Sequence, residues 1–324
     1  MSSRKINPFL KSNPDTGFGV QPSQIGGRFV NKDGSFNLSK EGWPWWRRIS
    51  IYSKLLALSS PQFFLLILSF FLVVNLMFTC LYMLVGIDQI KGLVATTEWG
   101  KVKEIFFFST QTFTTVGYGR VNPVGDEADL IASLESLTGL LSFAVFTGLL
   151  YGRFSRPKAY LAFSEQALIA PYGNGRALMF RIVPYKSNHH LTNAQVMVTI
   201  TFEVNEDGKS EYKFYSLKLE RSRIDTFNMN WTVVHPIDED SPLLHFSKED
   251  FQKTDLELYV LVSGFDQVFS NTVMQRTSYT SSEMIWGAKF KPMYHESADG
   301  STTVLELDKL DHFEKVELQE NIIV

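Results

Sequence analysis

Residues 101–119 of the chain read KVKEIFFFSTQTFTTVGYG, and this stretch decides the fold. Residues 101–114 predict one short helix, which is too short to cross a hydrocarbon layer of about 30 Å alone. The stretch lies between two long apolar segments, so we expect it at membrane depth. Irregular backbone at that depth is tolerated only where it is buried in protein or lines a cavity. We therefore predict a re-entrant helix over 101–114 that leads residues 115–119, TVGYG, into a cavity.

The two flanking segments are each long enough to span a membrane. Residues 61–87 read PQFFLLILSFFLVVNLMFTCLYMLVGI and carry no charge. They lie too far from the N-terminus, and are too long, for a secretory signal peptide. Residues 130–152 carry one charge, Glu135, and many small residues, which let helices pack closely in a bilayer. We predict an outer helix over 61–87 and an inner helix over 130–154, both in the cell membrane.

An amphipathic helix is predicted over 44–58, just before the first span. Its aromatic and aliphatic residues repeat at helical spacing, and basic residues occupy another face; the first set is Trp45, Ile49, Tyr52 and Leu56. A helix of this composition lies in the headgroup layer. We therefore expect an interfacial slide helix.

The glycines of TVGYG explain the irregular strand. A backbone that aims successive carbonyl oxygens at one axis must alternate between right- and left-handed conformations, and glycine adopts the left-handed one at low cost. Four such strands form rings of carbonyl oxygens that replace an ion's hydration shell, and TVGYG is the filter sequence of potassium channels. The pattern predicts a filter of Thr115, Val116, Gly117, Tyr118 and Gly119, with K⁺ bound at the first four. Since one chain supplies one strand, three identical partner subunits are implied.

Composition excludes several other classes of protein. The 324 residues carry a formal net charge of −3, which offers no basic field for nucleic acid. One cysteine, Cys80, excludes a disulfide framework, and the six histidines lack metal-ligand spacing. The sequence has no phosphate-binding loop, zinc-protease or serine-hydrolase motif. We expect no enzyme and no cofactor, and we interpret His235 as a structural hydrogen-bond partner.

Strand patterns dominate the chain after RFSRP at 153–157. Residues 196–204 alternate between apolar and polar, and a turn is predicted at 205–208. Further strands are expected at a spacing typical of a β-sandwich, over 177–183, 212–219, 256–262, 272–279, 285–290 and 302–307. The predicted organisation is an N-terminal segment (1–43), the slide helix (44–58), a transmembrane module (59–156) and a β domain (157–324). Phe29 and Val30 are candidates for a short edge strand on that domain.

Several motifs outside the filter resemble those of a known family. They are RFV at 28–30, DG at 33–34, RFSRP at 153–157, LERSR at 219–223, WTVVHPIDEDSPL at 231–243 and SYTSSEMIWGAKF at 278–290. Over nearly its whole length the chain resembles the inward-rectifier potassium channels, particularly their bacterial branch. The resemblance implies a homotetramer with cytoplasmic termini. It also implies a cytoplasmic, immunoglobulin-like β-sandwich that extends the pore and controls a gate.

The resemblance implies roles for residues of the inner helix. Gly139 and Gly148 match positions where that helix can bend. Phe143 and Tyr151 match bulky positions that constrict the inner mouth, where a ring of aromatic side chains can close a pore by dewetting. Packing against lipid is the alternative for Phe143 and Tyr151.

The resemblance also implies a site for anionic lipid, including phosphoinositide, at the cytoplasmic membrane boundary. Clustered basic residues attract acidic headgroups there. The matching residues are Arg47, Arg48, Lys54, Arg153, Arg156 and Lys158. The alternative is that these charges serve only topology and solvation.

One departure from the family concerns block by polyamines or Mg²⁺. Strong rectifiers carry acids where this chain has Phe143, Asn193 and Ser263. A polycation needs negative charge to hold it. We therefore predict weak rectification. Glu135 is the only acid of the predicted inner helix, and we favour a buried role behind the filter over a blocker site.

Two other functions remain open at this point. A membrane-anchored β-sandwich that binds a ligand and does not conduct would give TVGYG no role. A cation channel of low selectivity conflicts with an intact TVGYG sequence.

The basic residues that flank the spans outnumber those between them only slightly, so they favour cytoplasmic termini weakly.

Overall fold

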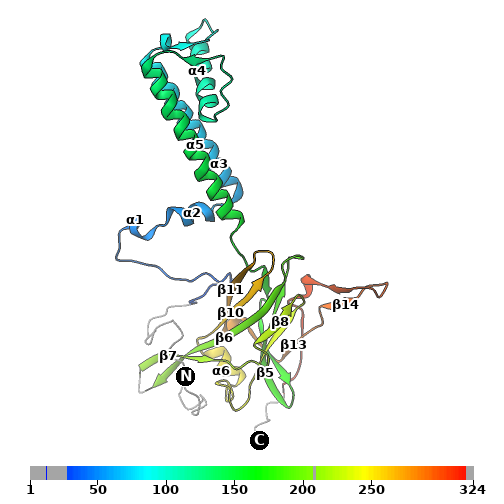
Figure 1. The fold of residues 1–324 in the computed structure, drawn as a ribbon. Helices are drawn as coiled ribbons and strands as arrows, with labels where there is room; N and C mark the ends of the chain where they lie inside the picture. Colours follow the sequence, from blue (N-terminus) through cyan, green and yellow to red (C-terminus); the bar gives the residue numbers. More distant parts are fainter. Residues whose placement is uncertain (1–11, 13–27, 207–208, 319–324) are drawn as a thin grey trace. The chain divides into compact units, whose positions relative to one another are not determined.

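The computed structural model describes residues 12, 28–206 and 209–318 (Figure 1). The chain forms two compact units. One unit is Glu41–Arg156, and the other joins Met1–Lys40 to Pro157–Val324. Two positions of the predicted turn at 205–208 lie outside the described residues, as do most residues of the predicted N-terminal segment.

The first unit contains two helices long and apolar enough to cross a membrane, α3 and α5. They run side by side, and α4 packs against both at one end (Figure 1). The prediction of two spans with a short helix between them is confirmed. The elements are α1 (Trp45–Arg48), α2 (Ile51–Ala57), α3 (Ser60–Val85), η2 (Ile87–Gln89), β1 (Ile90–Lys91), α4 (Glu98–Phe113), β2 (Asn122–Pro123) and α5 (Asp126–Phe154).

Two of these helices begin earlier than the sequence predicted. α4 begins at Glu98 because the Thr97 side chain accepts a hydrogen bond from a backbone N–H of the first turn (3.1 Å). α5 begins at Asp126, and its first turn carries acids that the positive end of the helix dipole stabilises. The prediction of a single slide helix over 44–58 was wrong, because the backbone is extended between α1 and α2 and Ser50 caps α2.

The second unit is built on two five-stranded sheets. One has the order β11-β10-β6-β7 with β8 beside β6, and the other has the order β12-β4-β5-β3 with β9 beside β5. Two small pairs, β13-β16 and β14-β15, complete it. The strands are β3 (Leu161–Phe163), β4 (Ala167–Tyr172), β5 (Gly175–Pro184), β6 (Leu191–Glu206), β7 (Lys209–Ser216), β8 (Arg223–Phe227), β9 (Trp231–Pro236), β10 (Leu256–Asp266), β11 (Asn271–Thr280), β12 (Met284–Trp286), β13 (Ala288–Phe290), β14 (Tyr294–Glu296), β15 (Thr303–Leu305) and β16 (Phe313–Lys315). Short helices are α6 (Lys248–Lys253), η3 (Ser281–Glu283) and η4 (Leu307–Lys309).

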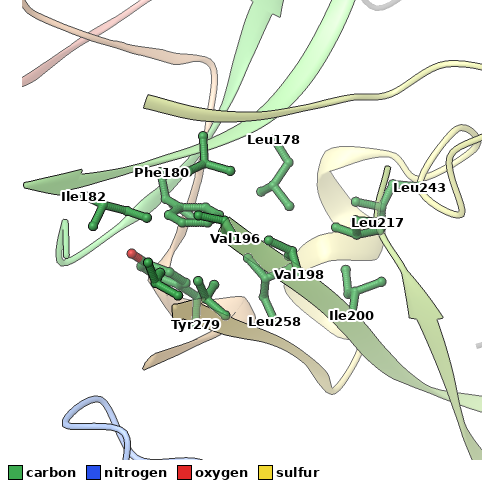
Figure 2. Close-up of a cluster of buried hydrophobic side chains, with 14 of the residues drawn as sticks. Leu178, Phe180, Ile182, Val196, Val198, Ile200, Leu217, Leu243, Leu258 and Tyr279 are labelled. Atoms are coloured by element: carbon green, nitrogen blue, oxygen red, sulfur yellow. The ribbon is translucent and has the colours of Figure 1, made fainter. Parts of the chain in front are cut away.

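One hydrophobic core lies between the two sheets (Figure 2). Alternate residues of β5 and β6 point into it and are almost fully buried: Leu178, Phe180, Ile182, Val196, Val198 and Ile200. The period of two predicted for residues 196–204 is therefore confirmed, since Met197 between two of them is 60% exposed. The predicted β-sandwich is confirmed.

Residues 28–36, which we name the N-terminal arm, dock on this domain without adding a strand to either sheet. Val30 pairs in an isolated bridge with Phe36, within the arm itself, so the predicted edge strand was wrong. The Glu257 carboxylate accepts hydrogen bonds from the backbone N–H groups of Phe29 (2.9 Å) and Val30 (3.2 Å). Arg28 binds Glu283 (3.0 Å). Side-chain bonds, not a sheet ladder, therefore fix the arm.

His235 is buried in the β domain and forms hydrogen bonds through both ring nitrogens. The ring is 2% exposed, its Nδ1–H donates to the Lys218 carbonyl (2.7 Å), and its Nε2 accepts from the Ser241 hydroxyl (2.8 Å). Burial disfavours the charged ring and lowers the pKa of His235 below its ordinary value. This confirms the structural role predicted for His235.

The unfolded state therefore binds the His235 proton first as pH falls, and stability drops below a pH of about 6.5, by about 1.4 kcal/mol per unit of lowered pKa. We expect thermal unfolding temperatures of the full chain to fall between about pH 7.5 and about pH 5.5. His235→Asn should flatten that dependence. An unchanged pH slope in the variant would contradict this assignment.

Candidate functional site

The backbone of residues 115–119 alternates in handedness. φ is positive at Thr115 (60°), Gly117 (51°) and Gly119 (81°), whereas Val116 and Tyr118 between them keep negative φ. Thr115 is the only one of these three positive-φ residues that is not glycine, and its β carbon makes this conformation sterically unfavourable. Successive carbonyl groups of such a strand can point to one side, which is the geometry that carbonyl coordination of an ion requires.

The end of α4 holds the inner part of this strand. The Gln111 carbonyl accepts hydrogen bonds from the backbone N–H groups of Val116 (2.9 Å) and Gly117 (3.2 Å). The Thr112 carbonyl accepts one from Thr115 (3.0 Å). These carbonyls are among the last of the helix, which have no partner inside it. The strand therefore satisfies the helix end, and the position of α4 sets the position of the strand.

A second set of contacts, which sequence reasoning missed, holds the outer part. Arg120 follows the strand directly and contacts the Glu104 carboxylate on α4 (3.4 Å) and the Gly92 carbonyl (3.0 Å). Glu104 also accepts a hydrogen bond from the backbone N–H of Val94 (2.8 Å). The only signal in the sequence is an acid on the short helix and a base just after TVGYG. Both ends of the strand are thus fixed to α4.

Two side chains of the strand are largely exposed in the single chain. Val116 is 53% exposed and Tyr118 is 80% exposed. No side chain of the described residues packs over them enough to bury them. One chain therefore presents a carbonyl strand whose outer surface is open to further contacts.

The inner helix meets α4 at two of the predicted positions. Glu135 is fully buried and contacts Ser109 on α4. One turn further along α5, a β carbon at Gly139 would collide with the carbonyl oxygen of Phe113, the last residue of α4. Gly148 has no atom within 4 Å of where a β carbon would stand. α5 is continuous through both glycines, so their role as bending points stays a prediction.

Two family profiles match the chain. The inward rectifier potassium channel C-terminal domain matches residues 161–323, and a profile described as ion channel matches residues 66–156. The inward rectifier potassium channel Kirbac3.1 of Paramagnetospirillum magnetotacticum is 33% identical over 287 residues, covering 87% of this chain and 94% of that protein. The chain belongs to the inward-rectifier potassium channel family. It is accordingly a membrane channel with K⁺ as the permeant ion, and not an enzyme.

Vertebrate inward rectifiers are similar over a smaller share. ATP-sensitive inward rectifier potassium channel 12 of Gallus gallus is 30% identical over 64% of this chain and 48% of its own length. Inward rectifier potassium channel 4 of Mesocricetus auratus is 29% identical over 59% of this chain and 45% of its own length. This chain thus spans about half the length of these two relatives. The solved structure of the sporulation control protein Spo0M from Bacillus subtilis matches 42% of this chain and 58% of its own at 11% identity, with a TM-score of 0.23.

The remaining positions on the inner helix of this inward rectifier are exposed. Phe143 is 73% exposed and Tyr151 is 74% exposed in the single chain. Side chains with this exposure are able to line an aqueous mouth or to face lipid.

The basic residues predicted to bind lipid have different surroundings. The Arg153 guanidinium turns to the start of α3, where it donates to the Ser60 hydroxyl (3.2 Å) and lies over the Phe63 ring (5.4 Å). Arg47 lies over the Trp43 ring (5.9 Å). The others are exposed side chains: Arg48, Lys54, Arg156 and Lys158. Lys158 belongs to the unit that contains the two large sheets, and the other five residues belong to the unit Glu41–Arg156.

Two of the three positions singled out for weak rectification, Asn193 and Ser263, lie on neighbouring strands of one sheet. Asn193 is on β6 with positive φ (52°), and Ser263 is on β10, where the register between these strands shifts. The Asn193 side-chain oxygen accepts a hydrogen bond from Arg223 (2.6 Å), which also pairs with Asp225 (3.3 Å). A guanidinium therefore lies directly beside one of the two positions.

Proposed function

We propose that the chain forms a homotetrameric, potassium-selective pore in which residues 115–119 of each subunit line the filter. The alternation of φ at Thr115, Gly117 and Gly119 is the observation that supports this most strongly. One subunit provides one carbonyl oxygen at each level, so four subunits are needed to replace the water around K⁺. The exposed surfaces of Val116 and Tyr118 then pack against neighbouring subunits, and the Thr115 hydroxyl adds the innermost ligands.

The gate in this proposal lies at the inner mouth, formed by Phe143 and Tyr151. Four aromatic side chains at one level narrow a pore enough to exclude water, and hence ions. Gly148 lies between the two, in open surroundings, where bending of the helix meets no neighbouring atom. The β domain controls this gate through its covalent link to the end of α5.

Anionic lipid, including phosphoinositide, binds the basic residues at the inner membrane boundary in this proposal, with both termini cytoplasmic. Exposed tryptophans beside Arg47 and Arg48 support an interfacial position, namely Trp43, Trp45 and Trp46, each more than 60% exposed. Basic residues near an anionic surface each contribute about 1 kcal/mol.

Uptake of radioactive rubidium into liposomes that contain the purified full chain tests this function. We expect rubidium uptake that barium blocks, and we expect sodium to be excluded. Both are measured with and without phosphoinositide. Equal uptake of sodium would indicate a cation channel of low selectivity. No uptake under any lipid condition, or a protein that sediments as a single subunit, would leave a membrane-anchored β-sandwich as the better account.

Weak rectification is a separate expectation. None of Phe143, Asn193 and Ser263 is acidic, so these positions offer no negative charge to hold a polycation. In excised patches, spermine should therefore block outward current weakly and with shallow voltage dependence. Introducing acids with Asn193→Glu and Ser263→Glu should increase that block at least about tenfold. Steep spermine block of the unaltered channel would contradict the prediction.

A further inference from the structure

A buried polar cluster lies behind the filter, where α3, α4 and α5 meet. The Glu135 carboxyl group on α5 is 2.5 Å from the Ser109 hydroxyl on α4 and 2.7 Å from the Tyr82 hydroxyl on α3. Ser109 is also 3.1 Å from the side-chain oxygen of Asn75 on α3. All four side chains are at most 1% exposed. One carboxyl group thus bonds the inner helix to both other helices.

The contacts of Glu135 are hydrogen bonds without a counter-ion. Among the described residues no Lys, Arg or His pairs with it, although an isolated charge at this depth is costly. The Ser109 hydroxyl has one proton but faces two acceptors, Glu135 and Asn75, and the Asn75 amide N–H group is directed to Phe71 (2.7 Å). The number of donors matches the number of acceptors when the Glu135 carboxyl group is a neutral acid. It then donates to the Ser109 hydroxyl, which in turn donates to the Asn75 side-chain oxygen.

The cluster is mechanically connected to the filter. Ser109 lies two residues before Gln111, whose carbonyl holds the N–H groups of Val116 and Gly117. On α5, Gly139 has no β carbon, and this lets the helix approach the backbone of Phe113 at the end of α4. A displacement of α4 at Ser109 would therefore move the filter backbone, and a misplaced carbonyl ring loses its fit to K⁺.

We propose that Glu135 is a positioning residue for selectivity, which acts on the filter through hydrogen bonds to Ser109 and Tyr82 and not through charge. The proposal rests on the proposed function of the filter. Glutamine has the same shape and supplies both a donor and an acceptor, whereas alanine leaves the two hydroxyl groups unpaired.

The test compares Glu135→Gln and Glu135→Ala with the unaltered channel in liposomes. The measured quantity is the ratio of rubidium to sodium uptake. We expect Glu135→Gln to keep the ratio and Glu135→Ala to lower it about tenfold. Glu127→Ala is the matched control, because Glu127 lies on the same helix, is exposed, and bonds only to Gln89 among the described residues (3.0 Å).

Variants that remove only one of the two hydroxyl partners of Glu135 keep the test valid if Glu135→Ala does not assemble. Tyr82→Phe and Ser109→Ala should each lower the ratio of the unaltered channel, by less than about tenfold. Where Glu135→Ala does assemble, Tyr82→Phe should add little in that background. A Glu135→Gln channel as unselective as Glu135→Ala would overturn the proposal, as would unchanged ratios in both Tyr82→Phe and Ser109→Ala. An unaltered channel without uptake would instead count against the proposed function.

Discussion

Gly117→Ala is expected to abolish rubidium uptake and to leave the oligomer intact. Gly117 has φ of 51°, and no atom of its own chain lies within 4 Å of where a β carbon would stand. The effect therefore comes from the backbone angle, not from a collision within the chain. A left-handed conformation costs an alanine about 1–2 kcal/mol, and the penalty occurs once in every subunit. Relief of that penalty turns a carbonyl group out of its ring.

Gly173→Ala is the matched control for this prediction. Gly173 lies in the turn between β4 and β5, with φ of 56° and no atom within 4 Å of a β carbon. It carries the same backbone penalty in the β domain and should leave uptake unchanged. Size-exclusion chromatography verifies that both variants assemble. Wild-type uptake by Gly117→Ala would mean that residues 115–119 are not the filter.

Gly139→Ala should prevent assembly of the channel, or strongly destabilise it. A β carbon there would collide with the carbonyl oxygen of Phe113 and stand 2.8 Å from its carbonyl carbon. Both are backbone atoms at the end of α4, so no side chain can move aside. Overpacking of this kind costs about 1–3 kcal/mol or more in each subunit. We expect little oligomer after detergent extraction, and no uptake.

Gly148→Ala separates this collision from a general need for glycine in the helix. Its β carbon would have no neighbour within 4 Å, and alanine favours the helix by up to about 1 kcal/mol. The variant should assemble as well as the unaltered chain. The thermal stability of the two detergent-solubilised variants is the measurement. Equal stability of Gly139→Ala and Gly148→Ala would show that the contact with Phe113 does not form in the assembled channel.

The parts of the fold that depend on local rules were predictable from the sequence. A hydrocarbon layer sets the length of the two spans, and the left-handed conformation selects glycine at 117 and 119. Alternation in residues 196–204 indicated which side chains of β6 enter the core. Thr115 shows the limit of this reasoning, because nothing in its side chain indicates a positive φ.

The side-chain contacts that support the filter could not be predicted, because they join residues far apart in the chain. Glu104 and Arg120 are separated by 16 positions, and Glu135 and Tyr82 by 53. Periodicity indicates which face of a helix is apolar but does not identify the partner of a polar residue on it. The buried role predicted for Glu135 followed from the cost of a charge, and its partners came only from the packing of three helices.

The docking of the N-terminal arm has a consequence for the order of events during synthesis. The arm leaves the ribosome early, yet its partners Glu257 and Glu283 follow 228 and 255 positions later, after both membrane helices. Domains otherwise tend to fold in order from the N-terminus. Here a segment that is made before both membrane helices finds its place only after residues 257 and 283 have followed. A bound arm therefore marks a chain that has been translated past Glu283, and so past both membrane helices.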